Sequence, residues 1–321
     1  MTYALLFPGQ GAQRCGMLHQ LPAAAETDRT LAEAADVLGR AVPGTLDDAD
    51  AMRGDTVAIQ LALVIAGTAT ARTLTARAPD PGYCAGHSVG AVTAAVAAGV
   101  LDLPDALDLV RLRGTLMARA YPAGSGHGMA GLSGLPERRV DELAAQVRSE
   151  GLAVYASNVN APDQVTASGS LAGIDRLVEL SRVAGLTKAV PLAVAVPAHC
   201  RLLGAVRDGL TARLAELQAR GRLRRARCGW VGTRTGQVLR RPEHIARDLA
   251  DGVAQPVRWH DMTTALYERG VRLFVEAAPG HGLARLAGTA FRGVRAVAID
   301  DIGIDSSALL AARHTRQDSA V

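Results

Sequence analysis

The chain has 321 residues, of which 49% are hydrophobic and 21% charged, a balance that excludes wholesale disorder and provides a sizeable core. Only 3% are aromatic, so we expect a core of Ala, Val and Leu, and single-stranded nucleic acid, which stacks on aromatic side chains, is not an expected partner. The net charge of +4 is too weak for DNA binding but suits an anionic substrate or an acidic partner.

The cysteines are far apart in the sequence, with no CxxC pair: Cys15, Cys84, Cys200 and Cys228. We therefore expect no disulfide framework and no metal site, but reduced thiols in a cytoplasm. The apolar run 1–7 lacks a basic region and a cleavage site, so it is expected to be a first strand and not a signal peptide. The nearly polar-free stretch 89–101 is too short to span a bilayer. These features predict a soluble cytoplasmic protein without membrane contact.

Strand-like and helix-like segments alternate along the chain, which predicts an α/β fold with a mainly parallel sheet. The first predicted elements are a strand at 3–7, a nearly all-apolar and therefore central helix at 57–78, a strand at 83–85, and helices at 89–99 and 102–120. The last ones are a helix to about 220, a hairpin at 232–236, two more helices and a strand at 273–276. The polar last dozen residues are expected to be frayed.

Between these parts the order of predicted elements changes to βαββαβ. Its strands are predicted at 129–135, 153–158, 164–168 and 187–194, and its helices at 136–149 and 171–183. This order is typical of a ferredoxin-like unit. We therefore expect a ferredoxin-like subdomain, residues 125–194, inserted in a larger α/β domain formed by 1–124 and 195–321.

The strongest local signal is the GxSxG motif at 86–90, between a predicted strand and a predicted helix. This context is typical of a nucleophile elbow, whose sharp turn has no room for side chains beside the serine and exposes its hydroxyl. The N-terminus of the following helix directs free N–H groups at an oxyanion formed there. The motif predicts Ser88 as a nucleophile, although GxSxG also arises by chance in a chain rich in Ala and Gly.

A serine nucleophile needs a base, and three histidines are considered for this role. His199 follows a strand and opens a helix, so it stands at a strand end, where a surface or capping histidine is the alternative. His281 is the reserve candidate, and His87 adjoins Ser88 but faces the wrong way. Cys200, next to His199, is expected to be a packed thiol.

Arg113 lies in an apolar turn of the helix at 102–120, where a cation is costly unless it is paired. It therefore either forms a structural salt bridge or waits for the carboxylate of a ligand. The loop 8–13 has too few glycines and no lysine for a phosphate loop, so no nucleotide site is expected. Its position after the first strand suits a second oxyanion donor.

Seven segments occur here in the order found in the malonyl-CoA:acyl carrier protein transacylases, which the chain resembles over roughly residues 1–300. They are FPGQGAQ (7–13), GHSVG (86–90), LRGTLM (112–117), NVNAPDQVTASG (158–169), VPAHCRLL (196–203), QPVRW (255–259) and EAAPG (276–280). The spacing of Ser88 and Arg113 also resembles that of the family. Single motifs of this length are weak, but seven in order are specific.

The resemblance implies a hydrolase-like sheet flanked by helices, with the ferredoxin-like insertion covering the active-site cleft. It implies that Ser88 is the acylated nucleophile and His199 its base, in a dyad without a carboxylate. Arg113 would hold the free carboxylate of a malonyl group by a bidentate pair, and the backbone N–H groups of Gln10 and Val89 would form the oxyanion hole. No bound cofactor or metal is implied: malonyl-CoA is the substrate, and the thiol prosthetic group of an acyl carrier protein is the acceptor.

Two departures from the family pattern point to one of its branches. Enzymes of fatty acid synthesis usually carry glutamine at the position of Gly252, whose backbone carbonyl is thought to orient the histidine, and Leu-Gly-Glu after the serine, where this chain has Val-Gly-Ala at 89–91. These departures, and four longer segments, resemble more closely the epsilon subunit of malonate decarboxylase, which loads malonyl onto the carrier subunit of its own complex. The segments are GQGAQRCGMLHQLP (9–22), QLALVIAG (60–67), LRGTLMARAYP (112–122) and VRWHDM (257–262).

Three other functions remain open on the sequence. A stand-alone transacylase of fatty acid or polyketide synthesis would use the same residues and differ only in its carrier. An esterase or thioesterase would let water attack the malonyl-serine. A non-catalytic subunit that only docks a carrier protein belongs to another class, and the intact set of Ser88, His199 and Arg113 disfavours it.

Overall fold

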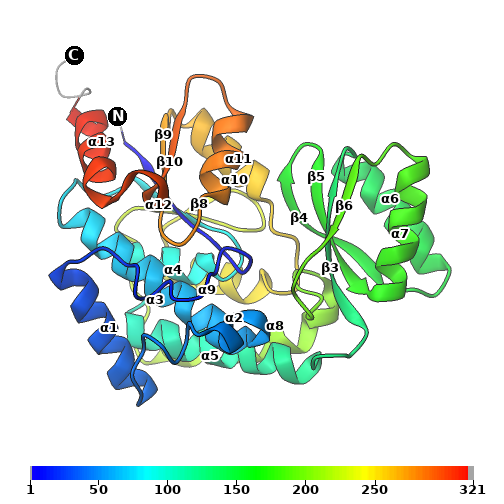
Figure 1. Ribbon diagram of the computed structural model, residues 1–321, viewed down its shortest axis with the longest axis horizontal. Coiled ribbons are helices and arrows are strands. Elements are labelled where there is room, and N and C mark those ends of the chain that lie inside the picture. Colours follow the sequence, from blue (N-terminus) through cyan, green and yellow to red (C-terminus); the bar gives the residue numbers. More distant parts are fainter. Residues whose placement is uncertain (1, 317–321) are drawn as a thin grey trace.

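The computed structural model describes residues 2–316, which form two sheets with helices packed on them (Figure 1). The larger sheet has six strands in the order β10-β9-β1-β2-β7-β8. These are β1 (Ala4–Phe7), β2 (Tyr83–Gly86), β7 (Gly229–Val231), β8 (Val238–Leu239), β9 (Leu273–Glu276) and β10 (Arg295–Ala298). All of their pairings are parallel except that of β7 with β8. The expected α/β fold with a mainly parallel sheet is confirmed.

Helices cover both faces of this sheet, and the alternation of β1 side chains shows why. Leu5 and Phe7 pack in the main core with α3, α4 and α5, whereas Leu6 packs in a second cluster with α10 and α11. The helices of this part are α1 (Ala25–Leu38), α2 (Ala49–Gly54), α3 (Thr56–Thr75), α4 (Gly90–Ala97), α5 (Leu103–Ala120), the 3₁₀ helix η1 (Arg201–Leu203), α8 (Gly204–Ala219), α9 (Pro242–Asp251), α10 (Trp259–Glu268), α11 (Gly282–Ala290), α12 (Ile299–Ile302) and α13 (Ile304–Arg316).

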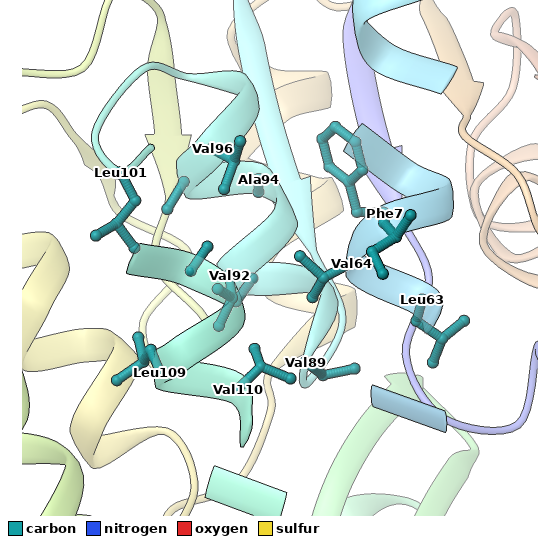
Figure 2. Close-up of a cluster of buried hydrophobic side chains, with 14 of the residues drawn as sticks. Phe7, Leu63, Val64, Val89, Val92, Ala94, Val96, Leu101, Leu109 and Val110 are labelled. Carbon is teal, nitrogen blue, oxygen red and sulfur yellow. The ribbon is translucent and has the colours of Figure 1, made fainter. Parts of the chain in front are cut away.

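Helix α3 is the central helix that its apolar sequence predicts. It begins after Asp55, whose carboxylate accepts the N–H groups of Val57 and Ala58 at 2.9 and 3.0 Å. Its Val64 lies with Phe7 of β1 and residues of α4 and α5 in one apolar cluster (Figure 2). Among the described helices it alone is long and apolar enough to cross a membrane, but 89% of that apolar window is buried, as in the core helix of a soluble protein.

The smaller sheet is antiparallel, in the order β4-β5-β3-β6. Its elements are β3 (His127–Ser133), α6 (Glu137–Ser149), β4 (Val154–Ala161), β5 (Gln164–Ser170), α7 (Leu171–Val183) and β6 (Lys188–Pro191). Both helices share one apolar cluster with the strands, at the right of Figure 1. This is the strand order of a ferredoxin-like unit. The unit lies within 125–194, and the division of the chain into two domains stays a prediction.

Backbone hydrogen bonds join β4 of the smaller sheet to the segment before α10. Val159 of β4 donates to the Val257 carbonyl, and Val257 donates to the Ser157 carbonyl, both at 2.9 Å. Arg258 adds a two-point contact with Glu137 of α6, at 2.8 and 3.0 Å. The ferredoxin-like unit is therefore fixed to the segment that precedes α10.

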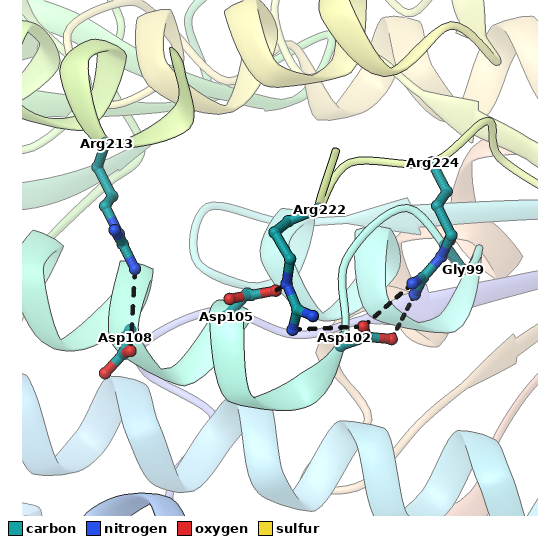
Figure 3. Close-up of polar contacts among 7 residues, drawn as sticks. All are labelled: Gly99, Asp102, Asp105, Asp108, Arg213, Arg222 and Arg224. Carbon is teal, nitrogen blue, oxygen red and sulfur yellow. Dashed lines mark hydrogen bonds and ion pairs between the residues drawn. The ribbon is translucent and has the colours of Figure 1, made fainter. Parts of the chain in front are cut away.

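Arginines after α8 hold the start of α5 in place (Figure 3). Arg222 Nε lies 2.8 Å from an Asp105 oxygen, and Arg224 pairs with Asp102. The hydrogen bond from Arg224 lowers the pKa of the Asp102 carboxyl. Pairs in which the arginine is about half exposed add little stability each, but these two attach the segment after α8 to the start of the helix that carries Arg113.

One contact was not expected from the sequence, and two expectations about local structure need correction. Cys84 and Cys228 are distant in sequence, but their Sγ atoms lie 3.5 Å apart because β2 and β7 are neighbours; both remain free thiols. The C-terminal residues are helical as far as Arg316 because α13 packs on α3, and 317–321 lie outside the described residues. Strand β6 is shorter than expected, and its Lys188, the single lysine of the chain, is exposed at the edge of the smaller sheet.

Candidate active site

Ser88 lies on the sharp turn between β2 and α4, with a φ of 55° in the left-handed region. The flanking glycines are required by the space around them. A Cβ on Gly86 would lie 2.1 Å from the backbone of Gly90, and one on Gly90 would lie 2.2 Å from the Phe7 carbonyl oxygen. The GxSxG segment therefore has the geometry of a nucleophile elbow, and chance occurrence does not explain it.

His199 reaches Ser88 from the loop before η1. Its Nε2 lies 2.7 Å from Ser88 Oγ, and its Nδ1 lies 2.6 Å from the carbonyl oxygen of Gly252. A carbonyl only accepts, so Nδ1 carries the proton and Nε2 is free to accept the proton of the serine hydroxyl. Burial, with a smaller effect from the charge of Arg113, lowers the His199 pKa to about 3, so the imidazole is neutral at physiological pH.

Arg113 of α5 completes this group of side chains. It is only 6% exposed, and its guanidinium donates to Gln60 Oε1 at 2.5 Å and to Ser88 Oγ at 3.2 Å. Burial lowers its pKa to about 10, so it stays charged at neutral pH. Within the described residues, no carboxylate lies within 4.0 Å of it. The structure therefore favours a buried cation beside the nucleophile that awaits an anion over a structural salt bridge.

The two expected oxyanion donors lie on either side of the elbow. Phe7 and Gly86 pair at the ends of β1 and β2, so the loop that carries Gln10 begins beside the elbow. A Cβ on Gly9 would lie 3.2 Å from the Cβ of Ser88. Among residues 2–316, neither the Gln10 nor the Val89 N–H donates to a protein acceptor. Both donors are therefore available to a ligand, and their role as an oxyanion hole stays a prediction.

Two cavities adjoin these residues. A small one of about 20 Å³ is lined by Ser88, Arg113 and His199, among others. A larger one of about 690 Å³ is formed by the loop 8–12, His87, and Asn160 and Gln164 of the ferredoxin-like unit. That unit therefore forms one wall of a cavity beside the elbow. A still larger cavity of about 890 Å³ lies near the segments that precede β2 and β7, and Ser88, His199 and Arg113 do not line it.

Comparison with known proteins gives this arrangement a family. Residues 4–302 match the model of the acyl transferase domain. A malonyl CoA-acyl carrier protein transacylase of Haemophilus influenzae is 33% identical over 94% of this chain and 96% of that protein. The chain belongs to the malonyl CoA-acyl carrier protein transacylase family. It is an acyltransferase.

Solved structures of transacylases share the whole fold. The acyl-carrier-protein S-malonyltransferase of Burkholderia pseudomallei is 34% identical, with a TM-score of 0.88 over 96% of this chain and 100% of that chain. A malonyl-transacylase in complex with a type II PKS acyl-carrier protein is 31% identical, with a TM-score of 0.89 over 98% of this chain and 100% of that one. The resemblance carried by seven short segments is thus confirmed over nearly the full length.

Two polar contacts at this site were not expected from the sequence. Gln60 is fully buried in α3 and accepts from Arg113; a polar residue in a nearly all-apolar helix is the signal that could have revealed it. Asn160 Oδ1 lies 3.1 Å from His87 Nε2. His87 is held by this contact and by the edge of Trp259, so it faces away from Ser88 as expected.

His281, the second candidate for the base, does not contact Ser88; His199 does. The His281 ring is half exposed and its Nδ1 lies 3.2 Å from Asp301. It lines the cavity of about 690 Å³ that the loop 8–12 also lines. Among the described residues, no group of three His, Cys, Asp or Glu side chains is arranged to hold a metal ion.

Glu276, in the segment EAAPG, is buried at the end of β9 and makes a testable contribution to stability. Its Oε2 accepts the Ala284 N–H at 2.7 Å, whereas its Oε1 has no partner among the described residues, and burial raises its pKa to about 7. The folded protein therefore binds this proton more tightly than the unfolded chain, and stability falls as the pH rises from about 4.5 to about 7. In the native chain this carboxyl should lower the free energy of unfolding by about 3 kcal/mol between pH 4.5 and pH 8. Glu276→Gln has no proton to lose there, so its free energy of unfolding should lack this decrease. Urea denaturation of both proteins at the two pH values measures it, and equal pH dependence would contradict it.

Proposed function

We propose that this acyltransferase moves a malonyl group from malonyl-CoA to the thiol of an acyl carrier protein through an acyl-enzyme on Ser88. One observation carries the proposal: a buried arginine with no carboxylate partner among the described residues contacts the hydroxyl of a Ser–His pair. A cation in that position selects an acyl group that ends in a carboxylate. The names of the related transacylases support the same substrate.

In the first half of the reaction His199 Nε2 takes the proton of Ser88 as Oγ attacks the thioester carbonyl. The negative charge that develops on the carbonyl oxygen is stabilised by the N–H groups of Gln10 and Val89; removing one such donor typically costs on the order of a hundredfold or more in rate. The carbon–sulfur bond then breaks, His199 returns its proton to the CoA sulfur, and malonyl-serine remains.

In the second half the carrier thiol enters where CoA left. His199 takes the thiol proton, the sulfur attacks the ester carbonyl of malonyl-serine, and the proton passes to Ser88 Oγ as the ester bond breaks. Arg113 holds the malonyl carboxylate through both halves, so the carbonyl stays over Oγ. A complex of a related transacylase with an acyl-carrier protein supports a carrier as the partner.

The proposal has two versions, which differ in the carrier protein. The relatives support best a carrier of fatty acid or polyketide synthesis. The relatives described above are named transacylases or S-malonyltransferases, and one of them is joined to a type II PKS carrier. The alternative, the epsilon subunit of malonate decarboxylase with that complex's carrier subunit, rests on the sequence segments alone. We also propose that the reaction takes place in the cytoplasm, which the separated cysteines without a CxxC pair favour.

Intact-mass measurement of the protein after incubation with malonyl-CoA tests the proposal. We expect one malonyl adduct, which disappears when a carrier protein with its thiol prosthetic group is added, while the carrier gains the same mass. A fatty-acid-type carrier, a polyketide-type carrier and a decarboxylase carrier subunit, tested in parallel, identify the pathway. Release of free malonate faster than carrier loading would refute transfer in favour of hydrolysis.

The pH dependence of acylation gives a second test. With a pKa of about 3, His199 remains unprotonated well below the ordinary histidine value of 6.5. We therefore expect kcat/KM for malonyl-CoA to be nearly flat from pH 8 to pH 5, because the free enzyme keeps its base over this range. A decline with a midpoint near pH 6.5, measured in initial-rate assays, would show that His199 titrates as an exposed histidine does.

A further inference from the structure

We propose that Thr233 and Asp248 are positioning residues for the base, which fix the Gly252 carbonyl that holds His199. This inference rests on the proposed acyl-transfer chemistry. Thr233 lies in the turn between β7 and β8, Asp248 lies in the last turns of α9, and neither contacts Ser88 by a hydrogen bond. They line the same cavity of about 20 Å³ as Ser88 and His199.

The Gly252 carbonyl lies directly after α9, at the end of the helix where the partial charge is negative. This end is held on several sides. The Gly252 N–H donates to the Asp248 carbonyl at 2.8 Å, and the His199 N–H donates to the Val253 carbonyl at 2.9 Å. The main chain and the imidazole of His199 are thus both attached to residues 252 and 253. A shift of this segment moves the base.

The Asp248 carboxylate ties this end of α9 to the β7–β8 turn. It is 2% exposed, and its Oδ1 accepts both the N–H and the hydroxyl of Thr233, at 2.9 and 2.7 Å. Arg234 approaches its Oδ2 at 3.4 Å. A buried carboxylate is costly unless donors satisfy it, so the turn and the helix end hold each other in one arrangement. We call Thr233 and Asp248 the brace.

The brace also explains why residue 252 is glycine. A Cβ at this position would lie 2.8 Å from Thr233 Oγ1 and 2.9 Å from the Asp248 carbonyl oxygen. Neither contact is possible without movement, and the hydroxyl is kept in place by its bond to Asp248. Any side chain at 252 therefore displaces either the Thr233 hydroxyl or the backbone of residue 252 itself, whose carbonyl His199 uses. Thr233 and Gly252 form a matched pair.

A double-mutant cycle tests this pairing. We expect Gly252→Ala to slow the reaction of Ser88 with a fluorophosphonate probe on the order of tenfold or more, since small displacements of catalytic groups carry large rate costs. Thr233→Ala in the same chain removes the hydroxyl that the new Cβ meets, so it should restore part of the lost rate. The several-fold deficit that follows from losing the hydroxyl's bond to Asp248 should remain. Thr233→Val, which keeps a group of similar size there, should not restore it.

A second measurement reports on His199 itself, without any acyl donor. In protein with isotope-labelled histidine, the Nδ1–H resonance of His199 should indicate a strong hydrogen bond in the native chain. It should shift in Gly252→Ala and move back part of the way in the double variant, a change that a loss of stability alone does not produce. If Gly252→Ala does not fold, Thr233→Ser and Thr233→Val in the otherwise native chain take its place, with the native rate and signal expected for Ser and a several-fold slower reaction for Val.

A native probe rate and Nδ1–H signal in folded Gly252→Ala would overturn the brace, as would a double variant no faster than Gly252→Ala alone. So would equal rates in Thr233→Ser and Thr233→Val. If the cycle behaves as expected but malonyl-CoA gives no adduct, the brace stands and the proposed substrate is wrong.

Discussion

Replacing Ser88 with alanine should abolish the malonyl adduct and lower carrier loading on the order of a thousandfold or more. The alanine lacks the oxygen that attacks the thioester, and loss of the nucleophile removes the whole covalent route, whatever the base and the oxyanion donors still contribute. The change removes one atom beside Arg113 and leaves the elbow's glycines in place, so the fold should be retained. Intact mass and transfer of labelled malonyl to the carrier measure the effect.

Ser133→Ala is the matched control, because Ser133 lies on β3 of the smaller sheet and, in the described part of the chain, forms hydrogen bonds through its backbone and not through its hydroxyl. It should load the carrier at the native rate. Undiminished loading by Ser88→Ala would mean that the chain only docks a carrier, the non-catalytic alternative considered from the sequence. Equal melting temperatures of the three proteins would exclude unfolding as the cause of any loss.

Arg113→Ala should lose malonyl transfer far more than acetyl transfer. Truncating one partner of a buried, hydrogen-bonded charge pair costs about 2–5 kcal/mol, which corresponds to roughly 30-fold to several thousandfold in malonyl transfer. An acetyl group has no carboxylate to lose, so the preference for malonyl over acetyl should fall by most of that factor. Gln60 loses its donor as well, so a lower melting temperature is expected alongside.

Arg111→Ala provides the control on the same helix, because Arg111 is half exposed and, among residues 2–316, forms an ion pair only with Asp108, three residues earlier. It should leave both rates near native. Competition between malonyl-CoA and acetyl-CoA, read as the ratio of the two adducts on Ser88, makes the comparison independent of how much protein is active. An unchanged ratio in Arg113→Ala would remove Arg113 from substrate selection.

Local sequence was sufficient for the elbow and for most elements, because these depend on neighbours in the chain. The glycines around Ser88, the apolar run of α3 and the βαββαβ order each indicate one local structure. Spacing alone could not decide between His199 and His281, because the choice depends on which loop the fold brings to Ser88. The proximity of Cys84 and Cys228 was missed for the same reason: it follows from the pairing of β2 with β7.

The brace could not be predicted from sequence patterns. Thr233 was assigned only to a hairpin, Asp248 was not singled out, and both are polar residues of an ordinary kind. Their role depends on a 2.7 Å contact between the β7–β8 turn and the last turns of α9, and on the space left at Gly252. The glycine itself was recognised as a departure, but its cause lies in the tertiary structure.

The single exposed lysine has a practical consequence. All other cationic side chains except histidines are arginines. An amine-reactive dye therefore labels one side chain, that of Lys188 on the edge strand of the ferredoxin-like unit. A fluorophore there would lie on the ferredoxin-like unit, whose β4 and β5 line the cavity of about 690 Å³ beside the elbow. The binding of an unlabelled carrier could then be followed optically, without engineering a cysteine into a chain that already has four.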